Sequence, residues 1–444
     1  MSKITLKEII EYQKGAVFKS QDYQKQGVGI VRVSDFEGDS ISLDNIYYIS
    51  NEIADKNKKV RLKPYDVVIT TVGATAGNFI RVPVEADGYL LNQNTVRLRT
   101  KENNKWDQIY LFYALKYKNF QEFLLLGAQG SAQPSIVLDQ ILDAEIAYPD
   151  NRREIAKKLF SMDQKIHLNT QINQTLEQIA QALFKSWFVD FDPVRAKVQA
   201  LSDGMSLEQA ELAAMQAING KTPEELTALS QTQPDHYAEL AETAKAFPCD
   251  MVEVDGIEVP KGWEIKALDE VANYQNGLAL QKFRPENNEP FLPVVKIAQL
   301  RQGYADGDEK AKANIKPECI INNGDVVFSW SGSLLVDIWC GGKAALNQHL
   351  FKVSSKEYPK WFYYFYTKHH LTEFQRIAYD KAVTMGHIKR EHLSAAKCIV
   401  PNDELLANKT LENILEKIIF NRLENFNLQD TRDLLLPRLL SGEI

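Results

Sequence analysis

Two stretches of the chain carry apolar residues at heptad spacing, which predicts two long amphipathic helices. The first covers residues 151–193 and the second covers residues 404–444. Polar residues interrupt both stretches at matching steps: Asn169 with Asn421, and Asn173 with Asn425. Buried asparagine fixes the register of paired helices. We therefore expect the two helices to pair along the seam positions Leu159, Ile166, Leu176, Leu183, Leu411, Ile418, Leu428 and Leu435. Two separate core helices are the alternative.

Each heptad stretch follows a region of mixed strand-like and helix-like patterns, and the two regions resemble each other. Asp66-Val67-Val68 matches Asp325-Val326-Val327, and Leu91-Asn92-Gln93 matches Leu346-Asn347-Gln348. An aromatic, helix-like run follows in both copies. The internal repeat predicts two similar α/β domains, residues 1–150 and 251–403, each followed by a long helix.

The segment between the first long helix and the second domain, residues 194–250, has no counterpart later in the chain. Capping boxes at Ser206 with Gln209 and at Thr222 with Glu225 predict short helices there. Pro193 is expected to end the first long helix, and Pro437 to kink or end the second, because proline lacks the N–H donor. The segment is therefore predicted to be a helical connector.

Composition places the chain among globular proteins, with 44% hydrophobic and 25% charged residues over 444 positions. No long uncharged apolar run and no leader-like start are present, so a cytoplasmic protein is expected. The four cysteines form no C-x-x-C pair, which predicts reduced thiols and no zinc ribbon. The net charge of −7 argues weakly against a protein that coats nucleic acid without specificity.

The motifs that mark common catalytic sites are absent from the sequence. Gly341-Gly342-Lys343-Ala344 lacks the spacing and the hydroxyl of a phosphate-binding loop. Asp192-Pro193-Val194 is not the tetrapeptide of an amino-methyltransferase, and the histidines match no metal-hydrolase motif. Asp163-Gln164-Lys165 is interpreted as solvated charge on the first heptad helix. We expect no catalytic residue and no metal site.

Several segments resemble Type I restriction-modification specificity subunits. Residues 182–194, ALFKSWFVDFDPV, resemble the central conserved region of that family, and residues 434–444, LLLPRLLSGEI, resemble its distal conserved region. Gly324-Asp325-Val326-Val327-Phe328-Ser329 and the weaker match Tyr65-Asp66-Val67-Val68-Ile69-Thr70 resemble a strand of its target-recognition domains. The similarity covers the whole chain in the family's order.

The resemblance implies a DNA-reading subunit that is not an enzyme. Residues 1–150 and 251–403 would be target-recognition domains, separated by two long helices that pair as an antiparallel coiled coil about a pseudo-two-fold axis. Two methyltransferase subunits carrying S-adenosylmethionine would methylate adenine at N6, and two restriction subunits would use ATP and Mg²⁺ for translocation and cleavage. No cofactor is expected on this chain. Thr70-Thr71-Val72-Gly73 differs from Ser329-Trp330-Ser331-Gly332, so the two halves of the split double-stranded DNA target should differ.

Two alternative functions are a stand-alone or fused DNA-modifying enzyme and a coiled-coil scaffold without DNA contact. Methyl transfer by the isolated chain would favour the first. DNA selectivity that survives loss of the helical pair would contradict the idea that the helices act as a spacer.

Residues that could contact DNA are polar groups in two loops and a basic run, because amides, hydroxyls and cations bind bases and phosphates. Helix capping and solvated charge are the alternatives for them. The candidates are Ser131, Gln133, Ser135, Lys381, Thr384 and His387 in the loops, and Lys56, Lys58, Lys59 and Arg61 in the run. Trp187, Phe188, Phe191 and Asp192 are candidates for a partner-docking surface, with simple packing of the helix end favoured over docking.

Overall fold

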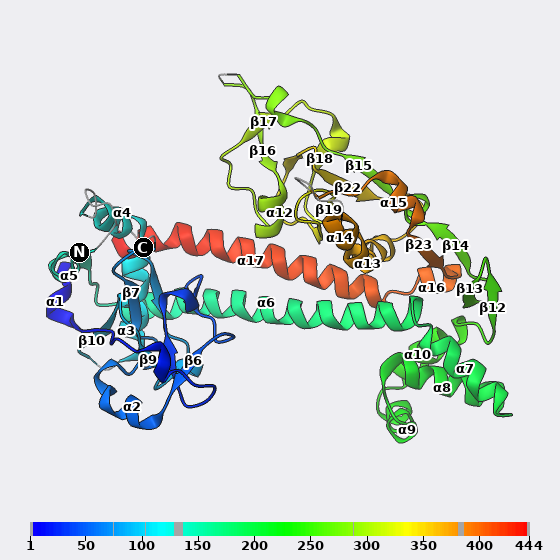
Figure 1. Cartoon of the computed structure of the whole chain (residues 1–444), viewed down its shortest axis with the longest axis horizontal. Coiled ribbons are helices and arrows are strands. Elements are labelled where there is room, and N and C mark those ends of the chain that lie inside the picture. Colours follow the sequence, from blue (N-terminus) through cyan, green and yellow to red (C-terminus); the bar gives the residue numbers. More distant parts are fainter. Residues whose placement is uncertain are drawn as a thin grey trace. The chain divides into compact units, whose positions relative to one another are not determined.

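A computed structural model describes residues 3–73, 75–102, 104–127, 136–286, 288–380 and 386–441 of the chain. The chain forms two compact units, Met1–His167 with Asn427–Ile444, and Leu168–Phe426. Both units mix helices and strands (Figure 1). No helix in the described ranges is long and apolar enough to cross a membrane.

The first unit is built on a four-stranded antiparallel sheet of order β2-β10-β7-β8 and a three-stranded sheet of order β6-β3-β9. In the smaller sheet β3 and β9 run parallel. The strands are β1 Lys3–Thr5, β2 Ile10–Lys14, β3 Val28–Val31, β4 Phe36–Glu37, β5 Ser40–Ile41, β6 Tyr47–Ile49, β7 Val67–Thr70, β8 Phe79–Arg81, β9 Leu90–Leu91, β10 Thr95–Thr100 and β11 Glu145–Ala147. The helices are α1 Leu6–Ile9, α2 Asn51–Lys56, α3 Lys105–Lys116, α4 Lys118–Gly127 and α5 Leu138–Leu142.

The second unit repeats this frame with a four-stranded antiparallel sheet of order β15-β22-β19-β20. A second sheet has the order β17-β16-β21-β18, and β16 and β21 run parallel as β3 and β9 do. The strands are β12 Met251–Val254, β13 Ile257–Pro260, β14 Glu264–Ala267, β15 Asn273–Asn276, β16 Phe291–Val295, β17 Lys310–Lys312, β18 Ile320–Ile321, β19 Val326–Ser329, β20 Leu335–Ile338, β21 Ala344–Leu346, β22 Leu350–Ser354 and β23 Lys397–Val400. The helices are α11 Leu268–Val271, α12 Ile297–Gln302, α13 Lys360–His369, α14 Leu371–Asp380, α15 Arg390–Ala395 and α16 Asp403–Leu406. The internal repeat is therefore a repeat of structure.

The connector is helical and belongs to the second unit. It contains α7 Asp192–Ser202, α8 Leu207–Asn219, α9 Pro223–Thr232 and α10 Pro234–Ala246. Both capping boxes are present, at Ser206 with Gln209 and at Thr222 with Glu225. The buried Lys197 ammonium donates to the Phe247 carbonyl at 2.7 Å, just beyond the end of α10. This contact joins the first and last helices of the connector.

The two heptad stretches form α6 Arg152–Phe188 and α17 Thr410–Ser441. Within the second unit, the Asn169 amide donates to the Asn425 side chain and the Asn421 amide donates to the Asn173 side chain, both at 2.9 Å. Each asparagine thus bonds to the one that is not its repeat counterpart, as an antiparallel pair requires. The antiparallel coiled coil is confirmed (Figure 1).

The expected end of the first long helix at Pro193 is wrong, and so is an end of the second long helix at Pro437. The first long helix ends at Phe188 and not at Pro193, because Phe191 takes a left-handed conformation with φ of 60°. Pro193 instead occupies the first turn of α7, where its missing N–H has no helical partner to lose. Pro437 lies inside α17, which continues to Ser441.

His370, next to the aromatic helix α13, makes the second unit sensitive to acid. Its Nε2 lies 2.9 Å from the Lys397 carbonyl, and its ring stacks on Tyr366. Burial lowers the pKa of His370 to about 4, and the neighbouring His369 adds to this effect. The unfolded chain binds the proton near pH ~6.5, whereas the folded chain does so only near pH ~4. Stability from this group is therefore lost as the pH falls through that interval.

The corresponding prediction compares the wild type with His370→Phe, which keeps a ring over Tyr366. Between about pH 7.5 and about pH 5, the free energy of unfolding should fall by about 1–2 kcal/mol more in the wild type. Urea unfolding at both pH values measures the difference. Equal pH dependence in the two proteins would contradict it.

Candidate nucleic-acid interface

In the first unit, three segments far apart in sequence meet beside one end of the four-stranded sheet. The backbone N–H of Thr71, just after β7, donates to the Asn94 carbonyl at 2.9 Å. The N–H of Ile136 in turn donates to the Thr71 carbonyl at 2.9 Å. The loop after β7, the turn before β10 and the segment that precedes α5 are therefore joined by backbone bonds.

The second unit repeats the arrangement with different side chains. The N–H of Trp330 donates to the His349 carbonyl at 3.3 Å, and the N–H of Ile388 donates to the Trp330 carbonyl at 3.0 Å. Ser331 Oγ and His349 Nδ1 are hydrogen-bonded at 2.9 Å. The Trp330 indole lies edge-on to His387, with 6.3 Å between ring centroids. The predicted contact residue His387 therefore lies among aromatic, hydroxyl and imidazole groups.

The other predicted loop contacts cannot be placed in this way. They lie outside the described residues. These candidates are Ser131, Gln133, Ser135, Lys381 and Thr384.

The predicted basic run lies on the surface of the first unit, at the end of α2 and in the turn that follows. Lys56 is paired with Glu52 at 2.8 Å, and Arg61 is held by a carboxylate at 3.0 Å. Lys58 and Lys59 are exposed, and neither has an ion pair within the ranges that the structure describes. Of the run, these two lysines are the ones available to a phosphate backbone.

A hollow of about 570 Å³ opens beside the turn between β21 and β22 in the second unit. No sequence pattern predicts this hollow as a site, because its walls come from four segments that no motif links. The sequence signal nearest to this hollow is the tripeptide Leu346-Asn347-Gln348, which matches Leu91-Asn92-Gln93. That match indicates the repeat but not a binding site. The walls are Leu280, Gln281, Arg284, Lys296, Ile297, Ala298, Glu309, Asn347, Gln348 and His349.

The interpretation of Asp163 as solvated charge is wrong. Its carboxylate accepts a hydrogen bond from the Tyr113 hydroxyl at 2.5 Å and from Arg432 at 2.8 Å, and Arg81 lies 3.8 Å away. Burial, reinforced by the Asp163 charge, raises the pKa of Tyr113. Burial alone would lower the pKa of Arg432, but the carboxylates beside it raise it. Asp163 is thus the centre of a partly buried network in the first unit.

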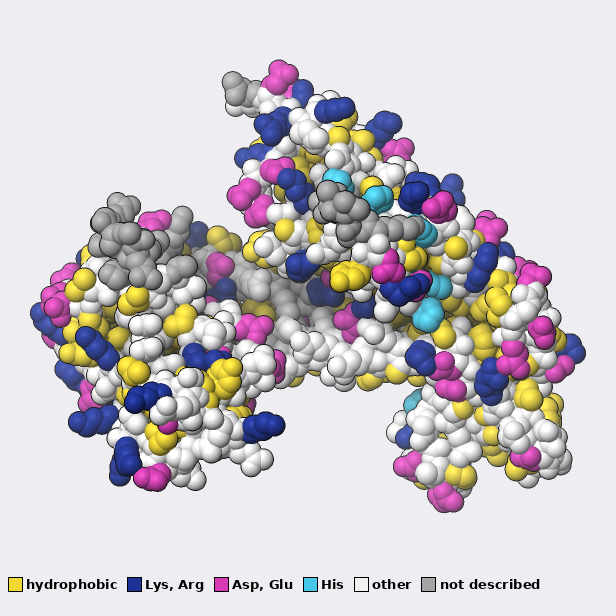
Figure 2. Space-filling view, in the orientation of Figure 1, with side chains coloured by type: hydrophobic (Ala, Val, Ile, Leu, Met, Phe, Trp, Pro, Cys, Tyr) yellow, Lys and Arg dark blue, Asp and Glu magenta, His cyan; other side chains and the backbone are white. Residues whose placement is uncertain are grey.

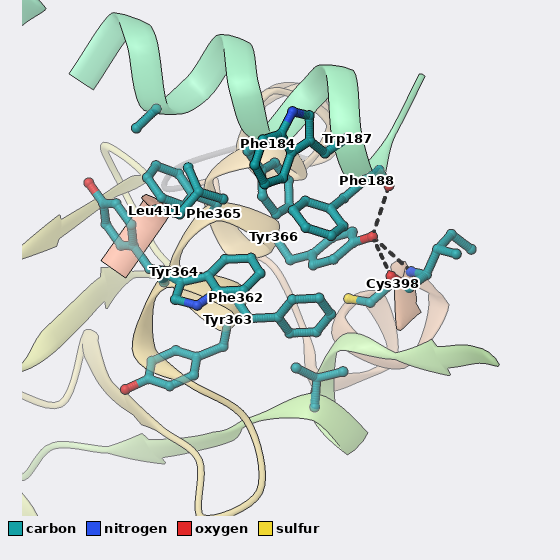
Figure 3. Packing of buried hydrophobic residues seen from close by; sticks show 14 of the residues in the cluster. Phe184, Trp187, Phe188, Phe362, Tyr363, Tyr364, Phe365, Tyr366, Cys398 and Leu411 are labelled. Carbon is teal, nitrogen blue, oxygen red and sulfur yellow. Dashed lines mark hydrogen bonds between the residues drawn. The ribbon is translucent and has the colours of Figure 1, made fainter. Parts of the chain in front are cut away.

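The candidate docking residues at the end of α6 are core residues of the second unit, with one exception. Trp187, Phe188 and Phe191 are buried, and the Phe188 ring lies 5.3 Å from that of Trp361. Figure 3 shows this end of α6 packed on α13, with a dashed bond from the Tyr366 hydroxyl to the Phe188 carbonyl. Their burial supports simple packing of the helix end, which the sequence favoured over docking. Asp192 is exposed.

The predicted seam residues all lie on protected faces of the two helices. Leu159, Leu411 and Ile418 are buried. The others are half-buried: Ile166, Leu176, Leu183, Leu428 and Leu435. The asparagine pairs and the Asp163 network interrupt this apolar seam.

Charge and metal-ligating groups are dispersed over the surface. Figure 2 shows Lys and Arg side chains interspersed with Asp and Glu on the visible face. Within the described residues, no three His, Cys, Asp or Glu side chains are grouped so that they could hold a metal ion. In each unit, the described residues thus place polar and aromatic side chains beside one end of the four-stranded sheet.

Comparison with known proteins identifies the family. The family model described as Type I restriction modification DNA specificity domain matches residues 1–178 and 260–431. The Type I restriction enzyme HindI specificity subunit of Haemophilus influenzae is 38% identical over 403 residues, which cover 87% of this chain and 88% of that protein. The MjaIX specificity subunit of Methanocaldococcus jannaschii is 24% identical over 88% of this chain and 81% of its own.

A solved structure shares the fold. The S subunit of the Type I restriction-modification system from M. genitalium aligns with 99% of this chain and 96% of its own, with a TM-score of 0.53 and 13% sequence identity. The duplicated sheets and the antiparallel helix pair are consistent with the two regions that match the family model. The chain belongs to the Type I restriction-modification DNA specificity family.

Proposed function

We propose that this chain binds a split DNA sequence, reading one half-site with each repeat, and positions methyltransferase subunits for N6-adenine methylation. Recognition of the DNA target, without catalysis, is the role of the specificity subunits that define the family, and it is the role of this chain. The proposal adds how the target is divided and where the partners attach.

The observation that carries the proposal is a repeated frame with unlike surfaces. Both units join the same three segments beside the same end of the sheet, but one presents Thr71 and Asn94 where the other presents Trp330 and His349. Side chains of different hydrogen-bonding capacity select different base edges. Two different half-sites, read on equivalent surfaces, follow from this difference.

The paired helices supply the separation between half-sites. Half-sites on one face of B-DNA lie roughly 34–36 Å apart when they are one turn from each other. α6 contains 37 residues, which at 1.5 Å per residue gives roughly 56 Å. A helix of that length can span such a separation, so the bases between the half-sites would be spanned and not read.

The asparagine pairs support two equivalent partner sites. The pair Asn169–Asn425 becomes the pair Asn421–Asn173 when each residue is replaced by its repeat counterpart. The helix pair therefore has an approximate two-fold axis near its asparagines, and an oligomer with such symmetry presents the same surface twice. We propose that two methyltransferase subunits carrying S-adenosylmethionine bind there, and that two restriction subunits with ATP and Mg²⁺ complete the complex.

Reconstitution tests this function. The purified chain, a Type I methyltransferase subunit from the same organism and both together are incubated with labelled S-adenosylmethionine and genomic DNA. Label should enter DNA only with both proteins present, at N6 of adenine. Transfer by the chain alone would contradict the non-catalytic role. A stable complex that methylates no DNA sequence selectively would contradict the recognition role.

Lys58 and Lys59 provide a separate prediction about affinity. Replacing both with alanine should weaken binding of specific and non-specific DNA alike, and should make the slope of log affinity against log salt shallower by up to about 2. Fluorescence titration of the assembled complex at several salt concentrations measures both effects. Lys56→Ala is the matched control, because Lys56 is already paired with Glu52. An unchanged salt slope would remove these lysines from the interface.

A further inference from the structure

We propose that the hollow beside the β21–β22 turn is a base-reading site, in which Gln348 and Arg284 select the base identity at one or two positions of the second half-site. The inference rests on the proposed function and deepens it, because it names the groups that read the DNA. It concerns the second unit alone.

Some polar side chains that face the hollow already form ion pairs within the protein, and others do not. Lys296 forms an ion pair with Glu309 on one wall. Gln281 and Arg284 are exposed, and their side chains form no hydrogen bond or ion pair within the described parts of the chain. With Lys296 and Glu309 cancelling, Arg284 leaves the hollow with one unpaired positive charge. An amide and a guanidinium left open beside a cavity can bind an external partner.

The turn that carries Gln348 is fixed by hydrogen bonds and by a close backbone contact. The N–H of Asn347 donates to the Val295 carbonyl at 3.0 Å, and the Asn347 side chain accepts from the N–H of His349 at 3.2 Å. Gly277 packs so closely that an added Cβ would lie 2.3 Å from the Asn347 carbonyl oxygen. A larger residue than glycine would therefore displace the turn. The backbone under Gln348 is thus preorganised.

The side chains at the tip of the turn are oriented by a hydrogen-bonded chain. Ser331 Oγ bonds to His349 Nδ1, and the Gln348 amide lies 3.3 Å from His349 Nε2. Half-burial of Gln348 restricts its rotamers and leaves part of its amide accessible. Such an amide has one donor side and one acceptor side, which match N6 and N7 of adenine.

The chemistry of Gln348 and Arg284 is that of direct base readout. Gln binds adenine through two hydrogen bonds, and Arg binds guanine O6 and N7 in the same way. Both residues lie in the repeat that also places Trp330 and His387 at the end of the sheet. A phosphate site would instead be expected to use several cations. The hollow has two, Arg284 and Lys296, and Lys296 is already paired with Glu309.

The first unit offers a matched residue for the opposite half-site. Gln93 occupies the position of Gln348, in a turn where the N–H of Gln93 donates to the Asn92 side chain at 2.8 Å. Gly15 approaches the Asn92 carbonyl as Gly277 approaches that of Asn347. A change at Gln93 should therefore act on the first half-site alone.

The test is to map N6-methyladenine in DNA from cells that co-express the chain with its methyltransferase subunit. Gln348→Ala and Arg284→Ala should each relax one position of the second half-site, lowering discrimination against the wrong base by roughly 5- to 150-fold. The first half-site should stay unchanged. Gln93→Ala should show the reverse pattern, and Gln302→Ala, exposed on α12 outside the hollow, should leave the motif intact.

Two results would overturn the inference. One is an unchanged motif in the double variant Gln348→Ala, Arg284→Ala, with wild-type assembly and melting temperature. The other is a uniform loss of methylation at an unrelaxed motif, which would make the hollow a phosphate contact. Absence of any methylated motif with the wild-type complex would instead contradict the proposed function, so the two failures are distinguishable.

Discussion

Replacing Asp163 with alanine is expected to lower the free energy of unfolding of the first unit by about 3–5 kcal/mol, because removal of one partner leaves buried charges unpaired. The Asp163 side chain is only 13% exposed, and it serves Arg432, Arg81 and the Tyr113 hydroxyl together. Arg81 already has one buried nitrogen without a partner in the described structure, so it has little capacity to compensate. Urea unfolding, followed with hydrogen exchange in residues 152–167, measures the loss.

The second unit provides the controls for this prediction. In the alignment of the two repeats, Leu415 corresponds to Asp163 and Ala180 corresponds to Arg432. Both Leu415 and Ala180 are buried in the core of the second unit. The double variant Asp163→Leu, Arg432→Ala copies that apolar solution for this pair, and it should recover the part of the loss that comes from the unpaired Arg432. Asp433→Ala removes an exposed partner of Arg432 and should change stability by less than about 0.5 kcal/mol. A loss at Asp163→Ala no larger than that at Asp433→Ala would contradict the network.

Phe188→Ala is expected to destabilise the second unit by about 3–5 kcal/mol, through lost burial and the cavity that remains. Its ring lies between Trp361 at 5.3 Å and Trp263 at 6.0 Å, and Phe184 is 5.6 Å away. Because these contacts join α6, α13 and the β14 region, the change should loosen all three together. Thermal unfolding of the isolated wild-type and Phe188→Ala chains measures this loss of stability.

Phe420→Ala is the matched control, since Phe420 lies on α17 and is 57% exposed. It should alter the isolated chain by less than about 0.5 kcal/mol. If Phe188→Ala left stability normal but weakened binding of the methyltransferase subunit, this result would contradict the packing role and favour a docking role for Phe188.

The helix pair could be predicted because its signals are periodic and local. Heptad spacing gave the two helices, and the matching asparagines gave their register. The end of α6 could not be placed from the sequence, because Pro193 suggested a helix end there. The left-handed Phe191 that separates the two helices has no such signal. The β-sheet repeat was predicted from matched tripeptides that lie in β7, β19 and the turns beside them.

The site was less predictable than the fold, since it depends on contacts between distant residues. Asp163 occupies a surface-like heptad position, and its partner Arg432 follows 269 residues later, so no local pattern reports the pairing. Gln281 and Arg284 become neighbours of Gln348 only through the folding of four segments around one hollow. Loop composition drew attention to residues 130–136 and 381–387. Of these, the described Ile136 and His387 lie beside the same end of each sheet.

Single-molecule sequencing of DNA from cells that co-express the wild-type chain with its methyltransferase subunit tests the central claim most directly. Two readers separated by a helix pair predict one N6-methyladenine motif with two unlike half-sites and a constant gap of unread bases. A continuous motif, a gap of variable length, or no modified motif from an assembled complex would contradict the account.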